Sequence, residues 1–276
     1  MGFIDKLRAR WRDADTLLCV GLDPDLARLP ERFLAGDALD EAEALFGFCR
    51  NIADATAEFA CAFKPQIAYF AAHNGGEAAL QRLIAHINAA HPQVPVILDA
   101  KRGDIGSTAQ QYACETFERY GADAVTLNPY MGRDSAQPFL QYHDRGCIFL
   151  CHTSNPGARD FQELPVDGEP LYRRIARTIA RDWNADGNCA LVVGATFPRE
   201  LAEIRAIVGD MPLLIPGVGA QGGDVEAVVR NGKAADGSGL MINSSRGILY
   251  AASGEGYAEA AAQAARELRD TINRWR

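Results

Sequence analysis

The stretch that decides the fold is Pro95-Val96-Ile97-Leu98-Asp99-Ala100-Lys101-Arg102-Gly103-Asp104, a short apolar run that ends in charged residues. Its apolar part, Pro95 to Asp99, has the length and the β-branched content of a fully buried strand. Seven more runs of this kind follow or precede it at similar intervals. They are Leu17 to Gly21, Cys61 to Pro65, Ala124 to Asn128, Cys147 to Cys151, Ala190 to Gly194, Leu213 to Gly217 and Gly239 to Asn243.

The segments between these runs are rich in Ala, Glu, Arg and Leu, a composition that favours amphipathic helices. Strands that alternate with helices of this size are typical of βαβ units around a buried parallel sheet. Eight units predict a closed (β/α)8 TIM barrel, class α/β, as a single domain over residues 1–276. The alternative to a closed barrel is an open, doubly wound parallel sheet with the same strands and helices. Residues 22–60 are long enough for two helices, and we expect residues 153–170 to form a functional loop.

The composition excludes several classes of function. The chain has 28 Lys and Arg against 36 Asp and Glu, a formal net charge of −8, so nucleic acid and anionic membranes are disfavoured as partners. Since no apolar run reaches about 18 residues and the N-terminus alternates charges, we expect a cytoplasmic protein without a membrane span. The seven cysteines contain no Cys-x-x-Cys pair, which disfavours disulfides and a zinc cluster.

The histidines do not form an obvious site in the sequence, and we expect no metal site. His73, His86, His91 and His143 fall in predicted helices or their connections, where surface or packing roles are favoured. His152 lies near a strand end beside Cys151. Because neighbours on a strand point to opposite faces, the two residues do not suggest a thiol nucleophile with its base.

Polar residues collect at the carboxyl ends of the predicted strands, which is the catalytic end of a barrel. Alternation along the third strand predicts that Asp99 and Lys101 share the inward face. Lys64, on the adjacent strand, is placed to contact the same carboxylate. Because buried charges are expensive unless they are paired, these residues predict either a reactive site or a structural ion-pair network.

A glycine-rich segment follows the seventh strand and contains a GxGxxG string at Gly217, Gly219 and Gly222. A dinucleotide site requires an acidic residue after the next strand, but Asp236 precedes the eighth strand, so that interpretation is disfavoured. TIM barrels commonly bind phosphate in the loops after the seventh and eighth strands. These glycines lie in the first of these loops, and Ser244 to Gly247 lie in the second. Arg246 adds a charge-assisted contact. The alternative is a tight turn without a ligand.

Together these segments resemble the orotidine 5′-phosphate decarboxylase family, in particular its longer bacterial branch. The string Asp99-x-Lys101-x-x-Asp104 is shared by a wider suprafamily, whereas its combination with Lys64 and Thr153 to Gly157 is more specific. The segments that carry the resemblance are Gly21 to Pro24, Phe63 to Pro65, Leu98 to Ala109, Thr153 to Gly157, Pro216 to Asp224 and Asn243 to Gly247.

The resemblance implies decarboxylation of orotidine 5′-monophosphate to UMP through a carbanion at pyrimidine C6, without cofactor or metal. It implies that Lys101 donates the proton to C6, that Asp99 lies beside the departing carboxylate and that Lys64 holds the charge network. It also implies a homodimer in which Asp104 and Thr108 reach the ribose of the neighbouring site. The remaining implied contacts are Asp23 to the ribose, Ser154 to the pyrimidine, and Gly217, Gly219, Gln221 and Arg246 to the phosphate.

Other functions share parts of this pattern. A Mg²⁺-dependent sugar-phosphate decarboxylase or aldolase of the same suprafamily would share the barrel and the phosphate loop, but Lys64 stands where such a relative would offer a carboxylate ligand. A Schiff-base aldolase is disfavoured because carboxylates hold a neighbouring lysine in its charged form. A non-catalytic nucleotide-phosphate binder would have no need for Asp99, Lys101 and Asp104.

Overall fold

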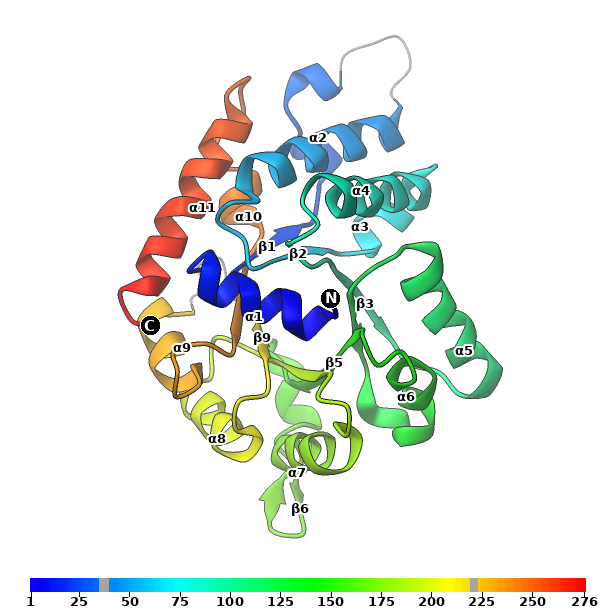
Figure 1. Ribbon diagram of the computed structural model, residues 1–276, viewed down its shortest axis with the longest axis vertical. Helices are drawn as coiled ribbons and strands as arrows, with labels where there is room; N and C mark the ends of the chain where they lie inside the picture. Colours follow the sequence, from blue (N-terminus) through cyan, green and yellow to red (C-terminus); the bar gives the residue numbers. More distant parts are fainter. Residues whose placement is uncertain (35–39, 219–222) are drawn as a thin grey trace.

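A computed structural model describes residues 1–34, 40–218 and 223–276. Eight parallel strands form one sheet in the order β2-β1-β10-β9-β8-β5-β4-β3. Parallel bridges from Phe63 to Val96 and from Gln66 to Asp99 join β2 to β3 and close the sheet into a barrel. The predicted (β/α)8 barrel is confirmed (Figure 1). The barrel strands are β1 (Leu18–Leu22), β2 (Ala62–Pro65), β3 (Ile97–Arg102), β4 (Ala124–Leu127), β5 (Gly146–His152), β8 (Cys189–Val193), β9 (Leu213–Ile215) and β10 (Leu240–Ser244).

Helices surround this barrel on its outer face (Figure 1). Short π-helical turns at Glu115–Arg119 and Ile179–Trp183 extend α5 and α7. The helices are α1 (Phe3–Asp13), α2 (Glu41–Thr56), α3 (Ala68–Ala71), α4 (Gly76–Ala90), α5 (Gly106–Cys114), α6 (Arg133–Leu140), α7 (Leu171–Thr178), α8 (Pro198–Val208), α9 (Val225–Gly232), α10 (Arg246–Leu249) and α11 (Tyr257–Asn273).

Helix α1 lies across the amino-terminal end of the barrel and closes it (Figure 1). Phe3, Leu7 and Trp11 are buried on one face of α1, and the Trp11 indole donates a hydrogen bond of 2.9 Å to the carbonyl of Leu240. The buried Arg10 donates to the carbonyl oxygens of Ala57 and Ala60. Helix α1 therefore covers the amino-terminal end of the barrel, and the carboxyl ends of the strands form the opposite, open end.

The connections differ in detail from the sequence expectations. In the described part of residues 22–60 the chain forms 3-10 turns at Leu26–Arg28 and Glu31–Phe33 and one long helix, α2. Residues 153–170 form a 3-10 turn at Pro156–Asp160 and a two-stranded antiparallel hairpin of β6 (Pro165–Val166) and β7 (Glu169–Pro170). This segment is ordered by local hydrogen bonds, because the Gln162 side chain accepts from the backbone N–H of Thr153 at 2.8 Å.

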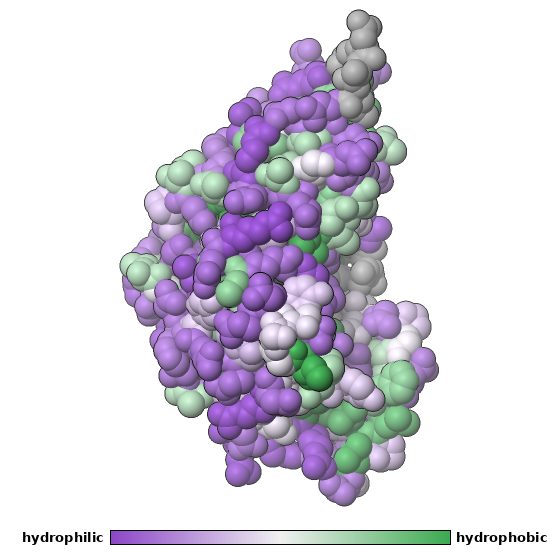
Figure 2. Space-filling model, turned by 90° about the vertical axis from the view of Figure 1, so that its right-hand side faces the viewer, coloured by the Kyte–Doolittle hydropathy of each residue, from purple (hydrophilic) through white to green (hydrophobic). Residues whose placement is uncertain are grey.

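The surface seen in Figure 2 is mainly hydrophilic, with hydrophobic residues gathered toward its lower right part. Apart from Met1, the exposed large hydrophobic residues in the described ranges all follow the carboxyl ends of barrel strands: Tyr69, Ile105, Tyr130, Met131, Phe161 and Leu164. The exposed apolar surface therefore lies around the open end. No helix in the described ranges is long and apolar enough to cross a membrane, and all seven cysteines are free thiols.

Candidate active site

Three charged side chains meet at the carboxyl ends of β2 and β3. The Asp99 carboxylate binds the Lys64 Nζ through Oδ2 at 2.8 Å and the Lys101 Nζ through Oδ1 at 2.7 Å. Lys64 and Asp99 are buried, whereas the Lys101 side chain is 47% exposed. Asp23, which follows β1, lies 3.9 Å from the Lys64 Nζ. The structure thus brings together four of the residues named from the sequence, and Lys101 is the member that faces the solvent.

The electrostatics of the cluster hold Lys64 and Asp99 in their charged forms. Burial alone would raise the pKa of Asp99, but Lys64 and Lys101 outweigh it and hold that pKa well below its ordinary value. Burial alone would lower the pKa of Lys64, but Asp23 and Asp99 raise it above its ordinary value. A buried ammonium and a buried carboxylate are therefore present together at neutral pH.

Thr126 on β4 supports this cluster and was missed by the sequence analysis. Its hydroxyl donates to Asp99 Oδ1 at 2.8 Å and accepts the backbone N–H groups of Ala100 at 3.1 Å and Lys101 at 2.9 Å. Lys101 has a φ of 47°, a left-handed conformation that costs a non-glycine residue about 1–3 kcal/mol unless its surroundings hold it. Thr126 thus orients both the carboxylate and the backbone of Lys101.

Some of the buried polar atoms without a hydrogen-bond partner lie at the same end of the barrel. In the described part of the chain they include Asp23 Oδ1, Thr196 Oγ1 after β8 and Asn243 Oδ1 on β10. Such atoms are costly unless a ligand or water satisfies them. Neither Thr196 nor Asn243 was assigned to the site from the sequence, and the structure shows that both offer polar atoms there.

The other predicted site residues follow the carboxyl ends of other barrel strands. Ser154 lies against the end of β8, where a Cβ on Gly194 would stand 2.7 Å from the Ser154 backbone nitrogen. Gly217 has a φ of 98°, and its carbonyl accepts the N–H of Gly223 at 3.2 Å. Arg246 is exposed at the start of α10. Gly219 and Gln221 lie outside the described residues.

Asp104 and Thr108 are not part of the ion-pair cluster. Asp104 makes no ion pair within the described ranges, and its Oδ1 accepts the N–H of Ile105 at 2.8 Å. Thr108 is exposed on α5. Asp104 is half-buried and directly precedes Ile105, whose side chain is exposed.

The Cys151–His152 pair is packed rather than reactive. The Cys151 thiol donates to the carbonyl of Tyr172 at 3.3 Å, and burial raises its pKa above the ordinary value. The His152 ring is buried between Tyr172 and Phe197, with ring centroids 4.7 and 4.5 Å away. Neither group points to nucleophilic catalysis.

A closed barrel with paired lysine and aspartate side chains at the carboxyl ends of its strands defines a class of protein, a TIM-barrel enzyme whose reacting centre is built from fixed charges. Comparison with known proteins narrows this class.

Residues 16–261 match the family described as Orotidine 5′-phosphate decarboxylase / HUMPS family. The chain is 62% identical over 276 residues to the orotidine 5′-phosphate decarboxylase of Azoarcus sp. (strain BH72), with 100% of both chains covered. It is 60% identical over 276 residues to the enzyme of that name from Dechloromonas aromatica (strain RCB), again with 100% of both covered. The solved structure of Leishmania donovani OMP decarboxylase has a TM-score of 0.86 and 40% identity, covering 100% of this chain and 99% of that chain. The chain belongs to the orotidine 5′-phosphate decarboxylase family, as the sequence resemblance indicated.

Proposed function

We propose that the protein decarboxylates orotidine 5′-monophosphate to UMP and CO₂ without a cofactor or a metal ion. Besides family membership, the observation that carries this proposal is the Asp99 carboxylate held between Lys64 and Lys101 at the open end of the barrel. This arrangement presents a half-exposed ammonium group to a ligand beside a fixed negative charge. It suits a reaction in which a carboxylate leaves the substrate as CO₂ and negative charge develops on the carbon that carried it.

Lys101 is the proposed proton donor. When the bond between C6 and the carboxylate carbon breaks, the electron pair stays on C6 and CO₂ departs. The Lys101 ammonium attracts the negative charge that develops at C6 and then transfers its proton there. Because the Lys101 side chain is 47% exposed, solvent has access to return the proton after the product leaves.

Asp99, Lys64 and Asp23 prepare the site for this step. Asp99 binds the Lys101 Nζ at 2.7 Å, which fixes the ammonium group, and we place the departing carboxylate of the substrate beside it. Lys64 pairs with Asp99 from the other side and keeps that carboxylate ionised. Asp23 Oδ1 lacks a hydrogen-bond donor, and we assign it to a ribose hydroxyl.

The remaining groups bind the two ends of the nucleotide. We assign Ser154 to the pyrimidine and Gly217, Gly219, Gln221 and Arg246 to the phosphate. The exposed guanidinium of Arg246 offers a paired contact to phosphate oxygens. Binding energy gained at the phosphate helps to close the loop after β5 over the base and to exclude water from the carbanion.

We further propose that the working unit is a homodimer in the cytoplasm. Thr108 is exposed and Asp104 is half-buried, and the exposed hydrophobic residues Ile105, Tyr130 and Met131 follow the ends of β3 and β4. An exposed apolar patch at the open end favours a protein contact, and a second copy there would bring Asp104 and Thr108 to the ribose of the neighbouring site. Seven free thiols suit a reducing compartment.

The test is the loss of the orotate absorbance when orotidine 5′-monophosphate is mixed with purified protein, with and without EDTA. The proposal predicts equal rates in both samples. Loss of absorbance only without EDTA would favour the Mg²⁺-dependent sugar-phosphate type of chemistry. No loss in either sample, with tight UMP binding retained, would favour a silent nucleotide binder.

A further inference from the structure

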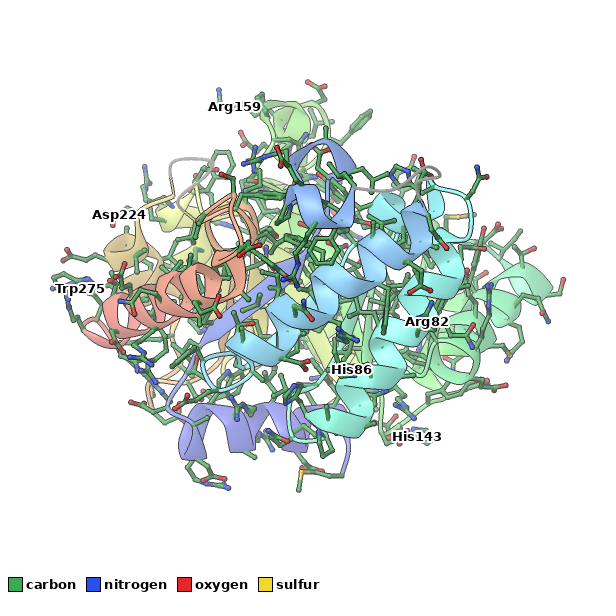
Figure 3. All side chains as sticks on the ribbon, turned by 90° about the horizontal axis from the view of Figure 1, so that it is seen from above. Arg82, His86, His143, Arg159, Asp224 and Trp275 are labelled. Atoms are coloured by element: carbon green, nitrogen blue, oxygen red, sulfur yellow. The ribbon has the colours of Figure 1, made fainter. Side chains whose placement is uncertain are left out.

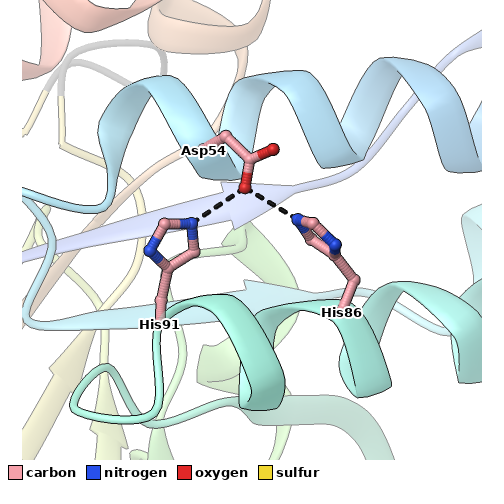
Figure 4. A group of neighbouring side chains, drawn as sticks. All are labelled: Asp54, His86 and His91. Atoms are coloured by element: carbon pink, nitrogen blue, oxygen red, sulfur yellow. Dashed lines mark hydrogen bonds and ion pairs between the residues drawn. The ribbon is translucent and has the colours of Figure 1, made fainter.

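Two histidines and one aspartate converge on the outer layer of helices, between α2 and α4 (Figure 4). The Nε2 atoms of His86 and His91 lie 2.7 and 2.8 Å from the same Asp54 oxygen, Oδ1. We propose that Asp54, His86 and His91 form a binding site for a divalent transition-metal ion of the Zn²⁺ type. This inference does not depend on the proposed decarboxylation.

The ends of two helices bring these residues together. Asp54 lies in the last turn of α2, His86 lies near the end of α4, and His91 directly follows Ala90, the last residue of α4. On an uninterrupted helix, residues five apart would point about 140° away from each other. His91 leaves the helix with φ −132° and ψ 55°, so its ring turns back toward His86 and stands at 78° to it.

The three ligand atoms are close enough for one ion. They all lie within 4.8 Å of one another. Tetrahedral zinc with bonds of about 2.0–2.2 Å places its ligand atoms about 3.3–3.6 Å apart. The separation between Asp54 Oδ1 and each imidazole nitrogen would therefore increase by less than about 1 Å, a change that small side-chain rotations supply.

The chemistry of the donors selects the type of ion. Two imidazole nitrogens and one carboxylate oxygen suit Zn²⁺, Co²⁺, Ni²⁺ or Cu²⁺, whereas Mg²⁺ and Ca²⁺ prefer oxygen ligands. In the metal-free cluster each Nε2 carries a proton that it donates to Asp54, and an ion would replace both protons. The negative ends of the α2 and α4 dipoles also favour a cation here.

The cluster is accessible, and it is far from the catalytic end. The side chains of Asp54, His86 and His91 are 43, 28 and 19% exposed, so water has room to complete the coordination. The helix ends concerned lead back to the start of β2 and β3, the end of the barrel covered by α1. In Figure 3, His86 lies on the side of α1, and Arg159, in the loop after β5, lies on the opposite side. An ion at this place would tie α2 to α4 and stabilise the barrel without touching the substrate.

Equilibrium dialysis of the EDTA-treated, dialysed protein against Zn²⁺ tests the proposal. All samples carry Cys114→Ser, since Cys114 is the one cysteine that is not buried and a thiol would compete for zinc. The variants His86→Gln and His91→Gln each remove one ligand. His73→Gln is the matched control, because His73 forms a single pair with Glu41 of α2 at 3.2 Å and no second imidazole is present there.

The proposal predicts about one Zn²⁺ per chain at micromolar free zinc, at least about tenfold weaker binding in His86→Gln and His91→Gln, and no change in His73→Gln. It also predicts that Zn²⁺ raises the melting temperature of the parent and of His73→Gln, but not of His91→Gln. Equal melting temperatures in EDTA and equal decarboxylase rates verify that the variants are folded. Zinc uptake that is unchanged in both ligand variants, or no uptake by the parent at about 0.1 mM free Zn²⁺, would overturn the proposal and leave a metal-free hydrogen-bonded clamp.

Discussion

Replacing Thr126 by Val removes one hydroxyl and keeps the shape of the side chain. This hydroxyl donates to Asp99 at 2.8 Å and accepts the N–H groups of Ala100 and Lys101, and Thr126 itself is buried. A hydrogen bond to a charged group contributes about 1.5–3 kcal/mol, and a buried donor left without an acceptor costs about 1–3 kcal/mol. We therefore expect Thr126→Val to lose about 2–5 kcal/mol of unfolding free energy, allowing for partial relaxation.

The same substitution tests whether Thr126 positions the reacting groups. Without the hydroxyl, Asp99 loses a donor and the left-handed backbone at Lys101 loses its support. We expect kcat on orotidine 5′-monophosphate to fall about 10–100-fold, corresponding to about 1.4–2.7 kcal/mol, with a much smaller change in UMP affinity. Thr126→Ser keeps the oxygen and should retain most of kcat.

Steady-state kinetics, UMP titration and urea unfolding of both variants provide the measurement. Two results would refute the reasoning. One is a Thr126→Val enzyme with the parental kcat and an unfolding free energy within about 0.5 kcal/mol of the parent. The other is a Thr126→Ser enzyme as impaired as Thr126→Val, since the loss would then not follow the hydroxyl.

Three further predictions concern charge. The lowered pKa of Asp99 stabilises the folded protein at pH values above about 3.9, the pKa of an aspartate in the unfolded chain, and this stability is lost as the pH falls through the folded-state pKa. As the pH is lowered from about 5 to 2, the urea midpoint of Asp99→Asn should therefore decrease less steeply than that of the parent. Parallel curves for the two proteins would contradict this. Mixing inactive Lys101→Ala with inactive Asp104→Ala should restore part of the activity through hybrid dimers, whereas no rescue in verified heterodimers would place Asp104 outside the neighbouring site. Arg246→Ala should raise the KM for orotidine 5′-monophosphate about 10–100-fold, which corresponds to the loss of a charge-assisted contact of about 1.5–3 kcal/mol. Turnover of the nucleoside without the phosphate should stay unchanged. An equal loss on both substrates would argue against a phosphate contact.

The barrel and the centre of its site were predictable because both depend on local pattern. Eight apolar runs separated by helical segments predicted the strands, and alternation on the third strand predicted that Asp99 and Lys101 lie together. The ion pair is present, although the chain reaches it through a register shift after Leu98 and a left-handed Lys101, which alternation does not describe. That detail depends on β4, and hence on contacts distant in sequence.

The residues that were missed give no signal in their local sequence. Thr126 stands inside an apolar run, where a threonine is an ordinary strand residue, and its role appears only when β4 lies beside β3. Asn243 and Thr196 stand at the carboxyl ends of strands, but the sequence does not show that their buried oxygen atoms lack hydrogen-bond partners. His86 and His91 were expected to have surface or packing roles, and Asp54 was not singled out. Their cluster is assembled from two helices and from a residue just beyond a helix end, so local sequence does not reveal it.

The Lys101 ammonium group is the proposed source of the proton that C6 receives. The most direct test of this role is the single-turnover rate of Lys101→Ala on orotidine 5′-monophosphate, measured beside UMP binding and the unfolding free energy of the same variant. We predict that turnover is almost abolished, while UMP binding and stability stay close to those of the parent, because the Lys101 side chain is 47% exposed. A folded, UMP-binding Lys101→Ala protein that decarboxylates at the parental rate would contradict the account.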